Sequence, residues 1–211
     1  MANIPPPARD RLLRLMRILE HNEGTITSGE IEALTGWTSN TIRKDISCLG
    51  PAQSFRGTSA GYAPERLIPR IREALGLTRR RKFCIVGLGR LGSAYLNPEP
   101  FEEDEFELAA GFDTSVNRVE ILSSRAPLYP SFKMAEVIQR QTIEIALLCV
   151  PAGAAQGAAE KLAAAGIQGI LNFAPVILRL PAGITVRNVY VADELRSLAA
   201  AMRQETKKQD T

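Results

Sequence analysis

A glycine-rich hexapeptide that directly follows an apolar run constrains this chain more than any other feature. Residues 83–86 read Phe-Cys-Ile-Val, and the next six are Gly87, Leu88, Gly89, Arg90, Leu91 and Gly92. A continuous apolar run is typical of a parallel strand covered on both faces. In such a strand-turn-helix unit the first glycine allows a tight turn, the second lets the backbone approach a pyrophosphate, and the third lets the helix pack on the strand. The hexapeptide therefore predicts a dinucleotide site, with the phosphates at the N-terminus of the following helix.

An acidic residue stands where such a site needs one. The second predicted strand, 106–112, is followed by Asp113, 21 residues beyond Gly92. A carboxylate there can accept hydrogen bonds from both adenosine ribose hydroxyls and repels a 2′-phosphate, which favours NAD(H) over NADP(H). Arg118, close by in the sequence, keeps NADP(H) open as an alternative. A second alternative is that Asp113 only caps the following turn.

The rest of the chain alternates strands and helices. Further strands are predicted at 143–150, 169–172 and 185–189, with an alanine-rich helix over 154–165. This alternation indicates an α/β fold with a parallel sheet, a Rossmann domain, in which ligands bind beyond the carboxyl ends of the strands. The residues expected there, bordering the nicotinamide half, are Val150, Pro151, Asn172, Phe173 and Ala174.

A last helix is predicted from Asp193 to about residue 206. Leu195, Leu198, Ala199 and Met202 recur on one of its faces. An apolar stripe of this kind buries itself against a partner surface. The partner is either its own domain or a second copy of the chain, and the periodicity leaves both open.

Three helices are predicted before residue 50. The first spans 8–21. A capping box of Thr27 and Glu30 opens the second, which buries Ile31 and Leu34. The third opens at residue 38 or 39 and turns three apolar residues inward, namely Ile42, Ile46 and Leu49. Short helices joined by a tight turn, with a polar face on the third, are typical of a helix-turn-helix.

The polar face of the third helix predicts double-stranded DNA as a partner. It carries groups that can hydrogen-bond base edges and cations that can bind phosphate, namely Ser39, Asn40, Thr41, Arg43, Lys44 and Ser47. Residues 54–62 are predicted to form a β-hairpin wing with Arg56 and Gly57 near its tip, where an arginine can reach a minor groove. The alternative is a three-helix unit that docks another protein.

The charge distribution agrees with a polyanionic partner for the N-terminal part. Residues 1–82 hold 14 Lys and Arg against 8 Asp and Glu, whereas residues 83–211 hold 12 against 15. The basic excess therefore coincides with the predicted helix-turn-helix.

A domain boundary is predicted near residue 80. A fourth helix over 65–75 ends at Gly76 and is followed by the basic run 78–82. The expected organisation is a winged helix-turn-helix domain over 1–80, a Rossmann domain over 81–190 and a C-terminal helix over 191–211. No apolar run approaches the roughly 20 residues of a membrane span, and the N-terminus lacks a secretory signal. We therefore expect a cytoplasmic protein without a membrane partner.

The sequence offers few residues that could act as catalytic groups or metal ligands. The chain has one histidine and three scattered cysteines without CxxC spacing, so neither a metal site nor a His-activated nucleophile is expected. Tyr129 and Lys133 match the Tyr-x-x-x-Lys pattern of short-chain dehydrogenases, but Pro130 and their early position argue against that role. Fewer than 100 residues follow Asp113, just enough to finish the nucleotide domain. We predict no catalytic residue and no metal; a small NAD-dependent oxidoreductase remains the less favoured alternative.

The motifs together resemble the Rex family of redox-sensing transcriptional repressors, nearly from end to end. The resemblance rests on several motifs in the family's order: 11–12 with 15–20, 42–47, 56–57 with 61–62, 84–92, 143–148, 165–167 and 169–175. It implies a homodimer whose winged-helix domains bind a palindromic operator and whose C-terminal helix is swapped between subunits. It also implies that NADH releases the protein from DNA while NAD⁺ competes for the same site, so that repression follows the NADH/NAD⁺ ratio.

The chain departs from the family pattern in places that bear on this switch. Cys48-Leu49-Gly50 stands where members usually carry Tyr-Phe-Gly, and the wing is longer. The family's Tyr after the glycine motif is displaced, with Tyr95 nearby. Tyr190-Val191 replaces a frequent Asp-Phe, whose Phe lies near the partner's nicotinamide. These changes leave the pyrophosphate and ribose contacts intact. A Rex-like DNA-binding protein with weakened or altered redox sensing is therefore the alternative function.

Overall fold

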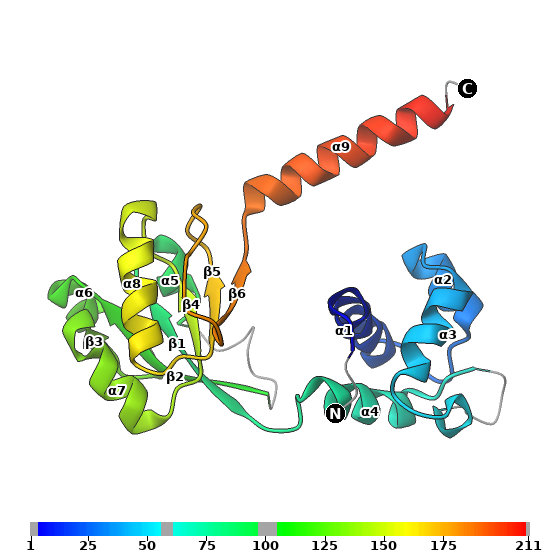
Figure 1. Cartoon of the computed structure of the whole chain (residues 1–211), viewed down its shortest axis with the longest axis horizontal. Helices are drawn as coiled ribbons and strands as arrows, with labels where there is room; N and C mark the ends of the chain where they lie inside the picture. The colour runs from blue at the N-terminus through cyan, green and yellow to red at the C-terminus, as the bar shows by residue number, and fades with distance from the viewer. Residues whose placement is uncertain (1–3, 56–60, 97–104, 210–211) are drawn as a thin grey trace. The chain divides into compact units, whose positions relative to one another are not determined.

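The protein consists of two compact units. The computed structural model describes residues 4–55, 61–96 and 105–209. Its contacts separate Met1–Arg79 from Arg80–Thr211, and the two units are shown in Figure 1.

The first unit is helical. Its elements are α1 (Pro6–Glu20), α2 (Ser28–Thr35), α3 (Ser39–Ser47), the 3-10 helix η1 (Ala52–Phe55) and α4 (Pro64–Leu75). One apolar cluster joins them, because each helix turns a stripe of aliphatic side chains inward, among them Leu12, Ile31, Ile46, Leu67 and Ile71. The helices predicted from the sequence are therefore present.

Local chemistry fixes the start and end of α2. The Thr27 side chain accepts a hydrogen bond from the Glu30 backbone N–H, and the Glu30 carboxylate accepts one from the Thr27 N–H at 2.7 Å. Gly36 ends the helix in the left-handed conformation, at φ 71°. The predicted capping box is confirmed. Burial of Leu34 is wrong, because its side chain is 67% exposed and only Ile31 of this helix is buried.

The predicted wing has a different structure where it is described. Ser54 and Phe55 lie in η1 rather than in a strand, and Tyr62 pairs with Ile26 in an isolated antiparallel bridge. Phe55 is instead buried in the apolar cluster. In a hairpin, successive side chains would point to opposite faces. The 3-10 turn instead directs Phe55 into the core. Arg56 and Gly57 lie outside the described residues.

The second unit is built on a six-stranded parallel sheet. Its strands are β1 (Arg81–Val86), β2 (Phe106–Asp113), β3 (Leu128–Pro130), β4 (Ile145–Leu148), β5 (Gly169–Asn172) and β6 (Thr185–Asn188). They lie in the order β3-β2-β1-β4-β5-β6, and all neighbouring pairs are parallel. This is the doubly wound order of dinucleotide-binding domains, with the change of direction between β1 and β4.

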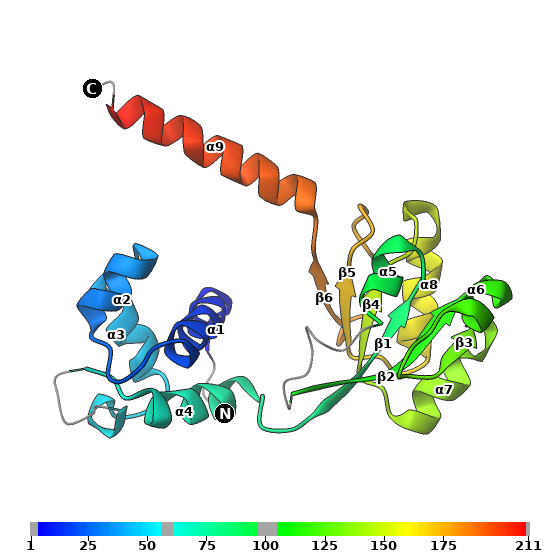
Figure 2. The ribbon, with the colours of Figure 1, turned by 180° about the vertical axis from the view of Figure 1, so that it is seen from behind.

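Helices cover both faces of this sheet. Four of them follow strands: α5 (Arg90–Ala94), α6 (Val116–Ile121), α7 (Met134–Gln141) and α8 (Ala152–Ala164), with the 3-10 helix η3 (Ser131–Lys133) preceding α7. Cys84 and Val86 of β1 pack in one cluster with α7 and α8, whereas Phe83 and Ile85 pack in another, beside residues of the α5 segment. In the opposite views of Figures 1 and 2, α8 and α5 accordingly lie on opposite sides of the sheet. This two-sided burial explains the continuous apolar run of β1.

The C-terminal helix α9 (Val191–Gln209) is longer than predicted. Val191, Leu195, Leu198 and Met202 are each 58–68% exposed in the single chain. They recur at spacings of three and four residues and therefore form one apolar stripe. Within the described ranges, no helix combines the length and apolarity needed to cross a membrane.

Candidate functional site

The three glycines of the turn between β1 and α5 have two different roles: two allow close packing, and one leaves the backbone accessible to a ligand. Gly87 has φ 89°, and a Cβ there would lie 2.6 Å from the carbonyl oxygen of Cys149. A Cβ on Gly92 would lie 1.9 Å from the carbonyl oxygen of Gly87, whereas one on Gly89 would meet nothing within 4 Å. Glycine is thus required at 87 by its positive φ and by the approach of Cys149 after β4, and at 92 by the turn itself. Gly89 leaves bare backbone facing open space.

Asp113, the last residue of β2, points its carboxylate at this turn. Its side chain is 4% exposed, and its Oδ2 accepts a hydrogen bond of 2.7 Å from the backbone N–H of Leu88. Its Oδ1 accepts one of 2.7 Å from the N–H of Ser115. Arg118 on α6 adds an ion pair, with Nη1 at 3.2 and 3.3 Å from the two oxygens. The strand end and the glycine turn are therefore locked together by one buried carboxylate.

A cavity of about 590 Å³ opens beside these groups. Its walls come from the carboxyl ends of β1, β2 and β4, from the start of η3 and α7, and from one face of α8. The lining residues are Val86, Gly87, Gly89, Phe112, Asp113, Thr114, Arg118, Ser131, Met134, Cys149, Val150, Pro151, Ala154, Gly157, Ala158 and Lys161. A cavity of this size suits a small organic ligand or part of a cofactor.

The structure brings five of the predicted cofactor residues into this cavity: Gly87, Gly89, Asp113, Val150 and Pro151. The remaining seven are outside its lining. Leu88 is buried but contributes its N–H to Asp113, Gly92 packs against Gly87, and Leu91 is 44% exposed. Arg90 begins α5. The cavity lining also lacks Asn172, the last residue of β5, and the two residues after it, Phe173 and Ala174.

Asn172 is fully buried in a hydrogen-bond network after β5. Its Nδ2 has acceptors in the carbonyls of Ala174 and Val176 and in the Asn188 Oδ1, at 2.9–3.1 Å, while its Oδ1 accepts the N–H of Ala174. Tyr190, next to α9, places its hydroxyl 3.3 Å from the same nitrogen and donates to the carbonyl of Val176. Asn172 therefore ties the loop after β5 to the start of α9. Phe173 packs against Tyr95, with ring centroids 5.6 Å apart.

Sequence reasoning missed one wall of the cavity. Ala154, Gly157, Ala158 and Lys161 of α8 line it, and they recur at spacings of three and four. Such a stripe of small residues on the crossover helix is a signal that was present in the sequence. Ser131 carried no comparable signal, whereas Met134 opens the apolar stripe of α7 with Val137 and Ile138, which was also present in the sequence. The Tyr-x-x-x-Lys pair is divided between β3 and η3, and Tyr129 packs against Phe112.

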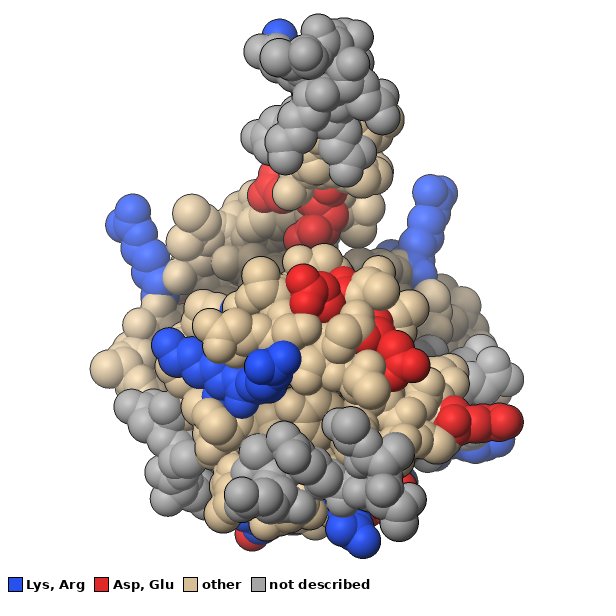
Figure 3. Space-filling view, turned by 90° about the vertical axis from the view of Figure 1, so that its right-hand side faces the viewer, with Lys and Arg blue, Asp and Glu red and all other residues tan. Residues whose placement is uncertain are grey.

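The second candidate surface is the outer face of α3. Asn40, Arg43, Lys44 and Ser47 are exposed at successive three- and four-residue spacings, while Ile42 and Ile46 are buried. The space-filling view of Figure 3 shows one cluster of basic side chains on the face toward the viewer, with acidic side chains in patches beside it. The structure thus presents one helix face with two cations and hydrogen-bonding groups, as a base-reading helix requires.

Two of the predicted DNA-contacting residues have intramolecular partners at the start of α3. Ser39 donates from its N–H and its hydroxyl to the Glu32 carboxylate, at 2.9 and 2.5 Å. These bonds, the hydroxyl bond foremost, hold the pKa of Glu32 below its usual value. The hydroxyls of Thr38 and Thr41 are 2.9 Å apart, and Thr38 caps α3. Ser39 and Thr41 therefore stabilise the helix start.

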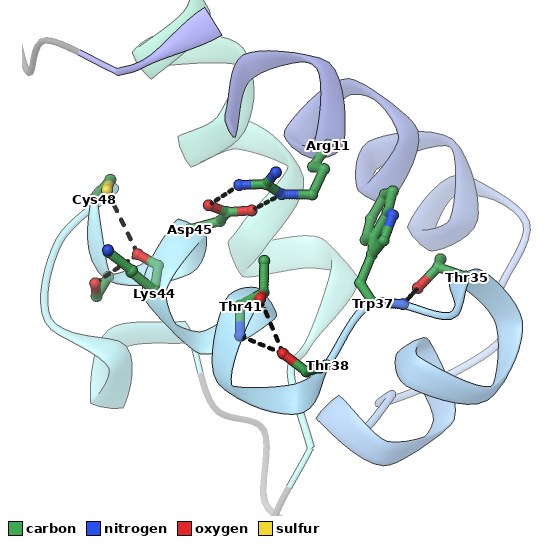
Figure 4. A network of polar contacts seen from close by, with 9 residues as sticks. Arg11, Thr35, Trp37, Thr38, Thr41, Lys44, Asp45 and Cys48 are labelled. Atoms are coloured by element: carbon green, nitrogen blue, oxygen red, sulfur yellow. Dashed lines mark hydrogen bonds and ion pairs between the residues drawn. The ribbon is translucent and has the colours of Figure 1, made fainter. Parts of the chain in front are cut away.

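A bidentate ion pair connects α3 to α1. Arg11 donates from Nε and Nη2 to the two oxygens of Asp45, at 2.6 and 2.9 Å, as Figure 4 shows. The Asp45 side chain is 8% exposed and that of Arg11 is 29% exposed. The hydrogen bond to Asp45 raises the pKa of Arg11 above its ordinary value. The polar side of α3 is thereby fixed relative to α1, with Trp37 beside the pair.

Among residues 4–55, 61–96 and 105–209, no three or more His, Cys, Asp or Glu side chains form a group that could hold a metal ion. Cys149 lines the cavity, but burial raises the pKa of its thiol to about 11. Its sulfur is therefore a neutral thiol at physiological pH.

The fold and these two surfaces define a class of protein: a ligand-responsive transcription regulator that joins a helix-turn-helix unit to a Rossmann domain. Residues 78–176 match the CoA binding domain family. The redox-sensing transcriptional repressor Rex of Thermus thermophilus is 38% identical over 215 residues, covering 94% of each chain. A crystal structure of RSP in complex with beta-NADH matches with a TM-score of 0.86 and 28% identity, covering 100% of this chain and 99% of that one.

A further crystal structure shows RSP in complex with beta-NAD+ and operator DNA; it matches with a TM-score of 0.85 and 30% identity, over 100% of this chain and 97% of that one. The protein belongs to the Rex family. The predicted α/β fold with an N-terminal helix-turn-helix unit is confirmed by these full-length matches. The relatives carry the name of transcriptional repressors rather than of enzymes.

Proposed function

We propose that this protein is a homodimeric transcriptional repressor of the cytoplasm that senses the NADH/NAD⁺ ratio, NADH binding releasing it from a palindromic operator. The cavity beside the glycine turn carries this proposal. It combines bare backbone at Gly89 with a buried carboxylate at Asp113, the two features that a pyrophosphate and an adenosine ribose require. A related protein has been crystallised with NADH, and with NAD⁺ and operator DNA.

The proposed cofactor contacts are limited to residues that line the cavity. Gly87 and Gly89 would lie against the pyrophosphate, and Asp113 would accept the ribose hydroxyls. Val150 and Pro151, expected from the sequence to border the nicotinamide half, line the same cavity as Asp113 and would therefore border the adenine and the pyrophosphate instead. Asn172 acts as a structural anchor in this proposal, because its amide is already saturated by intramolecular partners. The loop it anchors leads into β6, and Tyr190, the residue before α9, contacts Asn172 and this loop; in this proposal α9 connects the cofactor domain to the dimer.

The DNA contacts are assigned to the exposed face of α3. Asn40 and Ser47 can bond base edges, while Arg43 and Lys44 can bond bases or phosphates. A second copy of the chain would cover the apolar stripe of α9. Leu198→Glu should therefore produce monomers in light scattering, whereas Ser197→Glu should leave the dimer intact. Persistence of dimers in Leu198→Glu would contradict this part of the proposal.

A binding experiment tests the function directly. A DNA duplex is first enriched from random sequence by its binding to the full-length protein, and its complex is then titrated with NADH or NAD⁺ while fluorescence anisotropy is followed. We expect NADH to release the DNA at a lower concentration than NAD⁺. Arg43→Ala should weaken binding by about tenfold or more and reduce the salt dependence. Arg14→Ala, which removes an exposed arginine of α1, is the control and should change little.

A second candidate function is a Rex-like DNA-binding protein with altered redox sensing. Tyr190 favours it, because its hydroxyl bonds the loop after β5 within the same chain, at the position where the family resemblance leads one to expect Asp. Equal release of DNA by NADH and NAD⁺ would support this second function and exclude the first.

A further inference from the structure

Arg118 occupies the positions on Asp113 that a ribose needs. A carboxylate offers about four acceptor positions. In Asp113 two of them are filled by the backbone N–H groups of Leu88 and Ser115, each at 2.7 Å. The other two both face Nη1 of Arg118, at 3.2 and 3.3 Å. No acceptor position on this buried carboxylate is left for the two ribose hydroxyls until Arg118 withdraws.

The two kinds of contact to Asp113 differ in how easily they can be broken. The backbone donors belong to the glycine turn and to the start of α6, which are parts of the folded framework. The Arg118 side chain is 51% exposed and lines the cavity. Water competes for the half-exposed guanidinium, so this ion pair is weaker than one in which both partners are buried. A ligand can therefore displace Arg118 but cannot displace the backbone donors.

Arg118 also supplies what a 2′-phosphate would require. The Asp113 carboxylate repels a phosphate on the ribose, whereas a guanidinium beside it can bind that phosphate through two parallel hydrogen bonds. A single side chain thus opposes the ribose hydroxyls of one cofactor and favours the phosphate of the other. The second cation that lines the cavity, Lys161, is on α8.

We propose that Arg118 is a specificity-determining residue of the adenosine site: it competes with the ribose hydroxyls of NAD(H) for Asp113 and is the ligand for the 2′-phosphate of NADP(H). This inference rests on the proposed function, since it assumes that the cavity binds a dinucleotide. It predicts effects of opposite sign on two cofactors that differ by one phosphate group. That opposition separates it from a general effect of charge.

The test compares NADH and NADPH binding to full-length Arg118→Met, Lys161→Met and wild-type protein at one ionic strength, by titration calorimetry. Arg118→Met should bind NADH about two- to fivefold more tightly, because the competitor for Asp113 is gone. It should bind NADPH about tenfold less tightly, because the phosphate has lost its partner. Removing a cation normally weakens the binding of an anion, so a gain for NADH is specific evidence of competition. Lys161→Met should show no such gain.

Arg118→Lys distinguishes the effect of charge from that of shape, because lysine keeps the positive charge but lacks the planar guanidinium. This variant should keep much of the NADPH affinity. Thermal unfolding of each variant checks that the half-exposed substitution leaves the fold intact. If wild-type protein binds NADH while Arg118→Met shifts both dissociation constants in the same direction, or shifts neither, this inference is overturned and the proposed function stands. If wild-type protein binds neither cofactor, the proposed function fails and the inference fails with it.

Discussion

Replacing Arg11 by methionine tests how α3, the helix proposed to read DNA bases, is held in place. The substitution keeps the aliphatic stem of the side chain but removes both hydrogen bonds to Asp45, at 2.6 and 2.9 Å. It leaves a carboxylate that is only 8% exposed without its cationic partner. Breaking a fully buried pair in this way costs about 3–5 kcal/mol, and a surface pair about 0–1 kcal/mol. Because Arg11 itself is 29% exposed and water can reach the site, we expect a loss of about 2–3 kcal/mol.

The chain provides its own probe for this measurement. Trp37 is the only tryptophan and lines the same small cavity as Arg11 and Asp45. Its fluorescence during urea unfolding of the full-length protein therefore reports the helix-turn-helix unit. Arg14→Met, which replaces an exposed arginine of the same helix, is the matched control and should change the free energy of unfolding by less than about 0.5 kcal/mol.

A double-mutant cycle with Asp45→Asn decides whether the two side chains act as a pair. Asp45→Asn should cost about 1–2 kcal/mol, less than Arg11→Met, because the released guanidinium can still reach water. The double variant should be more stable than the sum of the two losses predicts, by about 1–2 kcal/mol. Simple additivity, with a coupling below about 0.5 kcal/mol, would refute the argument that the ion pair positions α3.

Three further predictions follow from the site. Gly92→Ala should destabilise the protein by at least about 2 kcal/mol in urea unfolding, because its Cβ would overlap a carbonyl oxygen. Gly89→Ala should keep its stability but lose at least about tenfold in NADH affinity by calorimetry. If both variants changed stability and affinity equally, the assignment of Gly92 to packing and Gly89 to ligand approach would be contradicted. Glu32 has a lowered pKa in the folded state, so its stabilising bonds to α3 are fully present above its unfolded pKa of ~4.3 and are lost as the pH falls through the folded value. Acid titrations followed by tryptophan fluorescence should therefore show wild type more stable than Glu32→Gln at neutral pH, with the difference vanishing in acid; a constant difference would refute it. Cys149, with its thiol pKa raised to about 11, should resist iodoacetamide at pH 8 under conditions in which exposed Cys48 is modified, as mass spectrometry can show; comparable labelling of both would contradict the buried, neutral thiol.

The elements that the sequence predicted well depend on neighbours along the chain. The capping box of α2 joins Thr27 to Glu30, three residues apart, and the helix ends at a glycine that alone tolerates the left-handed conformation without strain. The glycine turn is equally local, since Gly87 and Gly92 fit against each other within six residues. Strand β5 was predicted from Gly169 to Asn172, and the structure has the same bounds. Local geometry and apolar patterning depend on residues that are close together in the sequence, so they can be predicted before any tertiary contact is known.

The elements that were missed depend on partners distant in the sequence. β3 is only three residues long and exists because Leu128 pairs with Gly111 of β2. Of the helices that flank it, α6 buries no residue, whereas α7 has a signal that was present in the sequence, the apolar stripe of Met134, Val137 and Ile138. Leu34 fits an apolar stripe, yet its side chain is exposed because the described helices of its unit leave it uncovered. A pattern marks a residue as able to be buried, but only the packing of other elements buries it.

The glycine turn and the acid after β2 could thus be located from the sequence alone, because the backbone geometry of the turn demands glycine and the strand end fixes where the acid lies. What their side chains do was decided by the tertiary structure. Asp113 became a fully bonded carboxylate because the turn after β1 and the start of α6 converge on it. Asn172, in contrast, became a buried anchor because the loop after β5 and Tyr190 surround it. Sequence order places a polar group at the edge of the sheet, and only folding determines whether a ligand or the protein itself satisfies its hydrogen bonds.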